Sequence, residues 1–169
     1  MSARHLILLV AAGAALAACE TVPMGDFGPG PGPAAAAFNA GDFAWSTQPG
    51  RGSIAGRVDF SREGQSFDCT GSVALTPDTP YTRARFRTLC GSTDRAAIPE
   101  AVVRARTVPD PNADYRSFVR STTGQNGRFE FTGLPDGDWF IITPVSAGGD
   151  RIVLMRRIGT RGGRVSVTL

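Results

Sequence analysis

Glycine and proline interrupt every apolar run that follows the first 18 residues of this chain. The 169 residues include 21 Gly and 12 Pro, and only short segments in which apolar and polar residues alternate stand between them. Such alternation between turn-forming residues is typical of β-strands, and no stretch beyond residue 18 has the helical period. The sequence therefore predicts an all-β fold. The strands are expected at residues 53–60, 70–76, 81–89, 101–108, 115–121, 128–132, 138–145, 151–157 and 164–169.

One pair of these strands has a register that the sequence itself suggests. Pro77-Asp78-Thr79-Pro80 is a turn signal, and a hairpin around it aligns residues 70–76 with residues 81–89. On one face the pairs are Val73 with Phe86, Leu75 with Ala84, and Cys69 with Cys90. On the other face Ser72, Ala74 and Thr76 meet Arg87, Arg85 and Arg83. A slip by one residue would expose the apolar set, so this register is favoured.

Residues 138–145 are expected to form a central strand. Trp139, Ile141 and Thr143 alternate with Phe140 and Ile142, so that both faces of the strand are apolar. A strand that is covered on both faces has this pattern. We expect Trp139 to fill the core.

The first 18 residues have the three parts of a secretory signal peptide. Arg4 supplies the positive charge, and the uncharged run 6–18 is shorter than the roughly 20 residues that span a membrane. Leu16-Ala17-Ala18-Cys19 resembles the lipobox of bacterial lipoproteins, which implies cleavage before Cys19 and acyl chains on Cys19. Ordinary secretion is the alternative, because Ala15-Leu16-Ala17 also fits a small-x-small cleavage site.

The lipobox resemblance and the composition together predict three segments: a signal peptide (1–18), an acylated Cys with a Pro-, Gly- and Ala-rich tether (19–50), and a folded domain (51–169). The lipid would attach the protein to the bacterial cell envelope. Glu20 is not the Asp that favours inner-membrane retention in enteric lipoproteins, so the outer membrane is favoured, on its periplasmic or surface face. Acylation of Cys19 would leave Cys69 and Cys90 as an even pair in an oxidising compartment, which predicts a disulfide between them. Two free buried thiols are the alternative.

The basic residues exclude several classes of chemistry. All 18 are Arg, and the single His is His5, inside the signal peptide. The mature chain would thus have neither His nor Lys, which excludes Ser-His and Cys-His nucleophile pairs, His-based zinc or iron sites, and a Schiff-base Lys. Removal of Arg4 leaves 17 Arg against 15 acidic residues, a balance that does not suggest a nucleic-acid binder. We expect no enzyme activity, no cofactor and no metal.

Residues 121–139 resemble the hallmark of carboxypeptidase regulatory-like domains, which have the transthyretin-like (prealbumin-like) fold. The matching positions are Gly127, Phe129, Phe131, Leu134, Pro135, Gly137 and Trp139, with Asn126 before the first of them. The resemblance implies a single antiparallel β-sandwich of seven to nine strands, transthyretin-like or Ig-like. It places a tight turn at Asn126-Gly127 and both Phe side chains in the core. Either residues 71–75 or residues 101–105 would supply the second strand of the family.

Three Arg residues and one Trp are candidate binding residues. In the predicted hairpin, Arg83, Arg85 and Arg87 share one face at a spacing of about 7 Å, an arrangement that suits phosphates or acidic glycans. A solvated outer face that discourages aggregation is the alternative. Trp45, at the edge of the tether, is a candidate for stacking on a sugar.

The leading interpretation is a non-enzymatic envelope module that binds or braces another protein. The alternative is a lipoprotein that binds glycan or lipid A through exposed Arg and aromatic residues. The expected partners are the membrane, through the lipid on Cys19, and an unidentified envelope protein or glycan. Nucleic acid is not among them.

Overall fold

The computed structural model describes residues 36–69 and 71–169, so that the predictions for the signal peptide and Cys19 lie outside the described residues. The helical elements are η1 (Ala40–Thr47), α1 (Pro80–Cys90), α2 (Glu100–Ala105) and η2 (Asp114–Phe118). The strands are β1 (Gly52–Arg57), β2 (Phe60–Arg62), β3 (Gln65–Phe67), β4 (Ser72–Pro77), β5 (Arg95–Pro99), β6 (Arg120–Thr123), β7 (Arg128–Leu134), β8 (Gly137–Ala147), β9 (Asp150–Thr160) and β10 (Arg164–Thr168).

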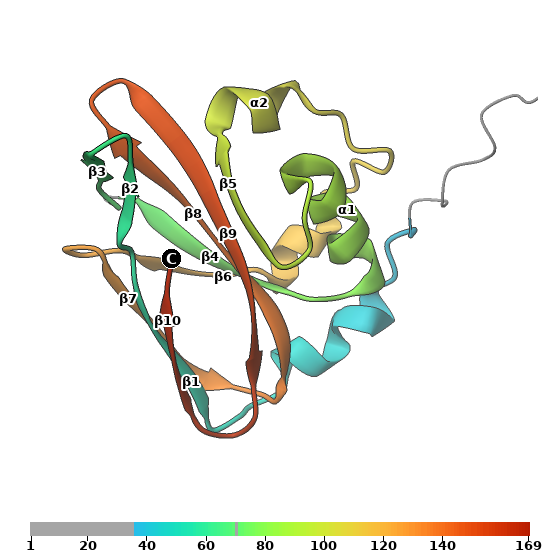
Figure 1. Cartoon of the computed structure of the whole chain (residues 1–169). Helices are drawn as coiled ribbons and strands as arrows, with labels where there is room; N and C mark the ends of the chain where they lie inside the picture. Colours follow the sequence, from blue (N-terminus) through green and yellow to red (C-terminus); the bar gives the residue numbers. More distant parts are fainter. Residues whose placement is uncertain (1–35, 70) are drawn as a thin grey trace, which may run out of the picture. The chain divides into compact units, whose positions relative to one another are not determined.

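The strands of the described residues form two main sheets and one short hairpin (Figure 1). The smaller sheet has the order β10-β1-β7, the larger sheet has the order β5-β9-β8-β4-β6, and β2 pairs with β3. The strand pairs are antiparallel except β1 with β10, which run parallel. The predicted all-β sandwich is confirmed, with eight strands in its two sheets. The parallel pair is a departure from the antiparallel arrangement that we expected.

The main core lies between the two sheets. It includes Ile54 and Val167 from the smaller sheet, and Leu75, Ile141 and Leu154 from the larger sheet. Phe129 and Phe131 are 5% and 6% exposed and Trp139 is 0% exposed, which confirms the core positions expected from the sequence. The indole Nε1 of Trp139 donates a hydrogen bond of 3.1 Å to Thr160 Oγ1, so that the polar atom of this buried ring is satisfied.

The tight turn at Asn126-Gly127 is also confirmed. The two residues have φ angles of 48° and 68°, and two consecutive positive φ angles define the type I′ hairpin turn. Gln125 and Arg128 close the turn through two reciprocal backbone hydrogen bonds of 2.9 Å each. Because β6 belongs to the larger sheet and β7 to the smaller sheet, this turn lies where the chain passes from one sheet to the other.

The segment predicted as the second strand of the hairpin is instead the helix α1. The Thr79 side chain accepts a hydrogen bond of 3.2 Å from the backbone N–H of Thr82, and the Thr82 hydroxyl accepts one of 2.9 Å from the backbone N–H of Thr79. Pro80 opens the helix and Gly91, with φ 71°, ends it, as is typical of helix termini. The predicted hairpin register is wrong, and β4 pairs with β6 and β8.

The helix α1 covers the face of the larger sheet that points away from the smaller sheet (Figure 1). Phe86 and Cys90 of the helix pack with Phe140 of β8 and Met155 of β9, and the ring centroids of Phe86 and Phe140 are 4.9 Å apart. β8 is the middle strand of the five and buries both faces, one in the main core and one against α1. The prediction of a central strand with two apolar faces is confirmed, and the helix explains it.

Two further predicted strands differ from the structure. Where residues 101–108 were expected to form a strand, β5 ends at Pro99 and residues 100–105 form α2. A strand was also expected at residues 115–121. Its residues up to Phe118 belong to η2 instead, and only its last two residues belong to a strand, β6, which pairs with β4. Of the two segments considered for the second strand of the family, 71–75 overlaps β4 and 101–105 is helical.

The folded unit begins before the predicted boundary at residue 51. Phe43 of η1 is 0% exposed and stacks on Phe118 of η2, with ring centroids 4.8 Å apart. The ring of Phe38 packs edge to face on the ring of Tyr81 of α1, with ring centroids 5.7 Å apart. These aromatic contacts show that residues 38–47 belong to the folded unit rather than to the predicted tether.

Candidate functional site

Cys69 and Cys90, predicted to form a disulfide, are free and buried. Cys69 lies in the main core, where its Sγ is 3.3 Å from Thr143 Oγ1. Cys90 lies on the other face of the larger sheet, beneath α1, and burial raises the pKa of its thiol. The predicted disulfide is wrong, because α1 replaces the strand that would have placed the two sulfur atoms together.

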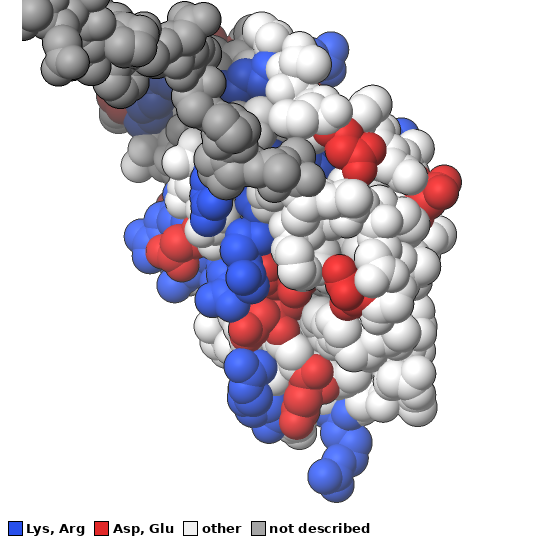
Figure 2. All heavy atoms as spheres, turned by 90° about the vertical axis from the view of Figure 1, so that its right-hand side faces the viewer, with Lys and Arg blue, Asp and Glu red and all other residues white. Residues whose placement is uncertain are grey.

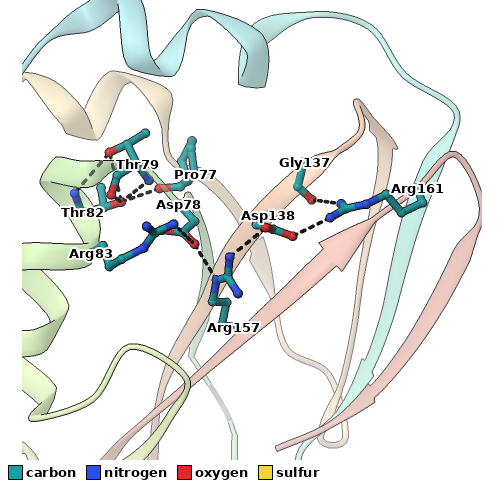
Figure 3. Close-up of polar contacts among 9 residues, drawn as sticks. All are labelled: Pro77, Asp78, Thr79, Thr82, Arg83, Gly137, Asp138, Arg157 and Arg161. Atoms are coloured by element: carbon teal, nitrogen blue, oxygen red, sulfur yellow. Dashed lines mark hydrogen bonds and ion pairs between the residues drawn. The ribbon is translucent and has the colours of Figure 1, made fainter.

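The three Arg residues predicted to share a face have three different environments. Arg83 donates hydrogen bonds of 3.0 and 2.9 Å from Nε and Nη2 to the carboxylate of Asp78 (Figure 3), and these bonds raise the pKa of Arg83. Arg85 lies over the ring of Tyr115, with Cζ 4.9 Å from the ring centroid, and Arg87 is exposed. Side chains at positions i and i+2 of a helix point in different directions, so the predicted common face is wrong.

Asp78 and Asp138 join three Arg side chains into an ionic network (Figure 3). The side chain of Asp78 is 0% exposed and also accepts a hydrogen bond from Arg157 Nε. Arg157 and Arg161 each donate to the carboxylate of Asp138, at 2.8 and 3.1 Å. The network connects the first turn of α1 to β8 and β9. On the face that carries α1, acidic side chains lie among the basic ones (Figure 2), as expected of charges that stabilise the fold.

Trp45, the candidate for stacking on a sugar, packs against the core of the domain. Its ring meets the ring of Trp139 edge to face, with centroids 4.8 Å apart. It also covers Gly137, where an added Cβ would lie 2.1 Å from the indole. This packing leaves Trp45 half-buried. Ligand stacking by Trp45 stays a prediction.

Within residues 36–69 and 71–169, no group of three or more His, Cys, Asp or Glu side chains is placed to hold a metal ion. No helix in this part of the chain combines the length and the hydropathy that a membrane span needs.

An open hollow of about 810 Å³ lies at the smaller sheet, beside the turn that precedes β7. Its lining residues are Ala55, Thr123, Gln125, Asn126, Arg128, Phe129, Glu130 and Arg164. The volume falls in the range of small-molecule sites. α1 packs on the other side of the larger sheet, so that it leaves this face of the smaller sheet open (Figure 1).

The alternation of side chains along β1 and β7 builds this hollow. In both strands buried residues alternate with exposed or partly exposed ones, so Ala55, Arg128 and Glu130 point away from the core. The register places Ala55 beside Glu130 on one neighbouring strand and beside Ser166 on the other. The small side chain of Ala55 on the middle strand therefore forms a floor, with longer polar side chains around it.

The charged groups of the hollow differ in how they are paired. Arg164 Nη1 is 3.1 Å from Glu130 Oε1, so this ion pair reaches from β10 to β7 across the middle strand. Arg57, opposite Arg128 in the register, pairs with Asp59. The side chain of Arg128 is exposed and has no hydrogen bond or ion pair with any other residue that the structure describes. The hollow thus offers one guanidinium that is not committed to the fold.

These residues were not predicted as a site from the sequence. The alternation in residues 53–57 and 128–132 indicates which side chains point outward. It does not indicate that β1 lies between β7 and β10, which is the arrangement that brings Arg164 to Glu130. The polar residues around the Asn126-Gly127 turn were the available signal for a binding surface.

No protein-family model matches this chain, and no curated protein matches it. Among solved structures, the crystal structure of a candidate carbohydrate binding protein from Pseudomonas aeruginosa is similar, with a TM-score of 0.52 and 23% sequence identity. The similarity covers 79% of this chain and 99% of that chain. At this level of identity the comparison shows a shared fold.

Proposed function

We propose that this chain is a carbohydrate-binding lipoprotein of the bacterial cell envelope and that it has no catalytic activity. The hollow at the smaller sheet would bind the glycan, and acyl chains on Cys19 would hold the protein at the outer membrane. The observation that carries the proposal is the set of amide, carboxylate and guanidinium side chains around the small floor at Ala55.

The side-chain types in the hollow suit the hydroxyl groups of a sugar. Each hydroxyl both donates and accepts hydrogen bonds, so neighbouring hydroxyls need donors and acceptors side by side. Gln125 and Asn126 each provide both kinds of atom. Glu130 accepts and Arg164 donates, and their charged groups lie within 3.1 Å of each other.

The carboxylates in the hollow favour binding without cleavage. Glycoside hydrolysis in its usual form needs two carboxyl groups, one on each side of the scissile bond. Glu130 is the only carboxylate among the described residues that line the hollow. A glycan held there would meet one acidic group and would leave unchanged.

The shared fold gives independent support. The similar structure from Pseudomonas aeruginosa is described as a candidate carbohydrate binding protein, and the similarity extends over nearly all of that chain. Bracing of another envelope protein, the leading interpretation of the sequence, stays a prediction.

The test is glycan binding before and after the hollow is filled. The full chain, made with Cys19→Ala so that it stays unacylated, is titrated calorimetrically with polygalacturonate, galactan and dextran. Ala55→Tyr should abolish binding, because the ring would occupy the floor of the hollow while leaving the core intact. Thr132→Tyr is the matched control, since Thr132 is exposed on β7 and does not line the hollow. Binding that survives Ala55→Tyr, or no binding of any polymer, would refute the proposal.

The lipid anchor needs a separate test. Cells expressing the full chain are labelled with radioactive palmitate and fractionated into inner and outer membranes. Label should appear in the protein and be lost with Cys19→Ala, and the labelled protein should sediment with the outer membrane. An unlabelled, freely released protein would show ordinary secretion instead.

A further inference from the structure

The charges of the hollow specify its ligand more closely than its shape does. Two guanidinium groups and one carboxylate line it, and Glu130 is paired with Arg164. Arg128 is left without a partner among the described residues. In the register Arg128 lies opposite Arg57, but the charge of Arg57 is compensated by its ion pair with Asp59. An anion in the hollow can therefore pair with Arg128 without displacing a contact of the fold.

The apolar surface of the hollow is small. Phe129 is the only aromatic residue among the described residues of its lining, and it is 5% exposed. Stacking on an aromatic ring is a main source of affinity for a neutral sugar, and this lining does not provide an open ring. Affinity must therefore come from polar contacts, of which those between charged groups are the strongest.

We propose that the hollow binds an acidic glycan, in which a carboxylate of a uronic acid residue pairs with Arg128 while the neighbouring hydroxyls contact Glu130 and the turn amides. This inference rests on the proposed function. The planar guanidinium matches a carboxylate through two parallel hydrogen bonds, whereas it has no such match with a hydroxyl. The Glu130–Arg164 pair keeps Glu130 from repelling the acid, because its charge is already compensated.

The experiment compares two polymers that differ only in the acid group. The full chain with Cys19→Ala is titrated with polygalacturonate and with the same polymer after chemical reduction of its carboxyl groups. The acidic polymer should bind about tenfold more tightly, because its carboxylate forms charged hydrogen bonds with Arg128 that the reduced polymer lacks. The difference should shrink as the ionic strength rises from about 0.01 M to about 1 M, where the screening length falls to about 3 Å.

Arg128→Gln should remove most of the preference for the acidic polymer, because the glutamine amide carries no charge to pair with the uronate. Arg116→Gln is the matched control, because Arg116 is exposed on η2, outside the hollow, and its loss changes the net charge equally. Equal binding of the two polymers would overturn the acidic preference while leaving carbohydrate binding in place. An equal effect of the two substitutions would also overturn it, since net charge alone would then explain the preference. Failure of both polymers and of neutral glycans to bind would refute the proposed function itself.

Discussion

The buried carboxylate of Asp78 should be the most important single charge for the stability of the domain. It accepts three hydrogen bonds, two from Arg83 and one from Arg157, while its own side chain is 0% exposed. Its backbone N–H also donates to the carbonyl oxygen of Asp138 at 2.9 Å, so the residue is fixed to β8. The substitution Asp78→Asn keeps the size of the side chain and removes its charge.

The loss of folding free energy that we expect for Asp78→Asn follows from these contacts. Three hydrogen bonds to charged partners have an upper bound of about 5–9 kcal/mol. The Arg83 and Arg157 side chains are 45% and 37% exposed, so water can replace much of what they lose, and the amide oxygen introduced by Asp78→Asn can still accept one bond. The expected loss is about 2 kcal/mol, which lowers the melting temperature by about 8 °C for a domain of this size.

Urea unfolding followed by far-UV circular dichroism measures this loss. Asp59→Asn is the matched control, because the Arg57–Asp59 pair has both side chains more than half exposed and should cost at most about 0.5 kcal/mol. Equal losses in the two variants would refute the claim that burial makes Asp78 important. A double substitution with Arg83→Gln should cost less than the sum of the single losses, since both remove the same contact.

Two substitutions and an analysis of the thiols test the packing. Gly56→Ala should cost at least about 2 kcal/mol in urea unfolding, because an added Cβ would lie 1.9 Å from the ring of Phe129. Thr79→Ala should cost about 1 kcal/mol through loss of the α1 cap, and an unchanged unfolding midpoint would contradict that role. Intact-mass analysis without reductant should find Cys69 and Cys90 as free thiols. Because Cys90 is 6% exposed, and burial also raises the pKa of its thiol, iodoacetamide should label it at neutral pH only after unfolding.

The sequence was most informative where one strand follows another through a short turn. Phe129, Phe131 and Trp139 have the spacing of residues that point into the core. The Asn126-Gly127 pair strongly favours one type of tight turn, type I′. Residues 128–145 were therefore predicted close to their observed form. The resemblance to carboxypeptidase regulatory-like domains stays a prediction, although the sandwich that it implied is present.

The helix α1 was missed because its sequence satisfies two patterns at once. Arg83, Arg85 and Arg87 alternate like the outer face of a strand, whereas Thr82, Phe86 and Cys90 follow the i, i+4, i+8 spacing of a helix. The capping residues decide between the two, since Thr79-Pro80 and Gly91 are strong signals for the ends of a helix. The common face of Arg83, Arg85 and Arg87 was derived from the strand pattern alone and is wrong for that reason. The disulfide was also predicted from the even number of remaining cysteines, but α1 separates the two sulfur atoms that the hairpin would have brought together.

The hollow could not be predicted, because its residues come from strands whose order in the sheet is not encoded locally. Arg128 and Arg164 are far apart in the sequence, and both reach the hollow only because β1 lies between their strands. Local alternation gives the face on which each side chain lies. The pairing of β1 with β10 depends on contacts across the whole domain.

The parallel pairing of β1 with β10 also constrains the order in which the smaller sheet can form. Ser53 pairs with Arg164 and Arg57 with Thr168, so this sheet is complete only when the first and the last strands of the domain have met. Until then the edge of β1 that faces β10 has unpaired backbone groups. An open edge of this kind is a template for pairing with another chain. Slow formation of this one long-range contact would therefore expose the folding protein to aggregation.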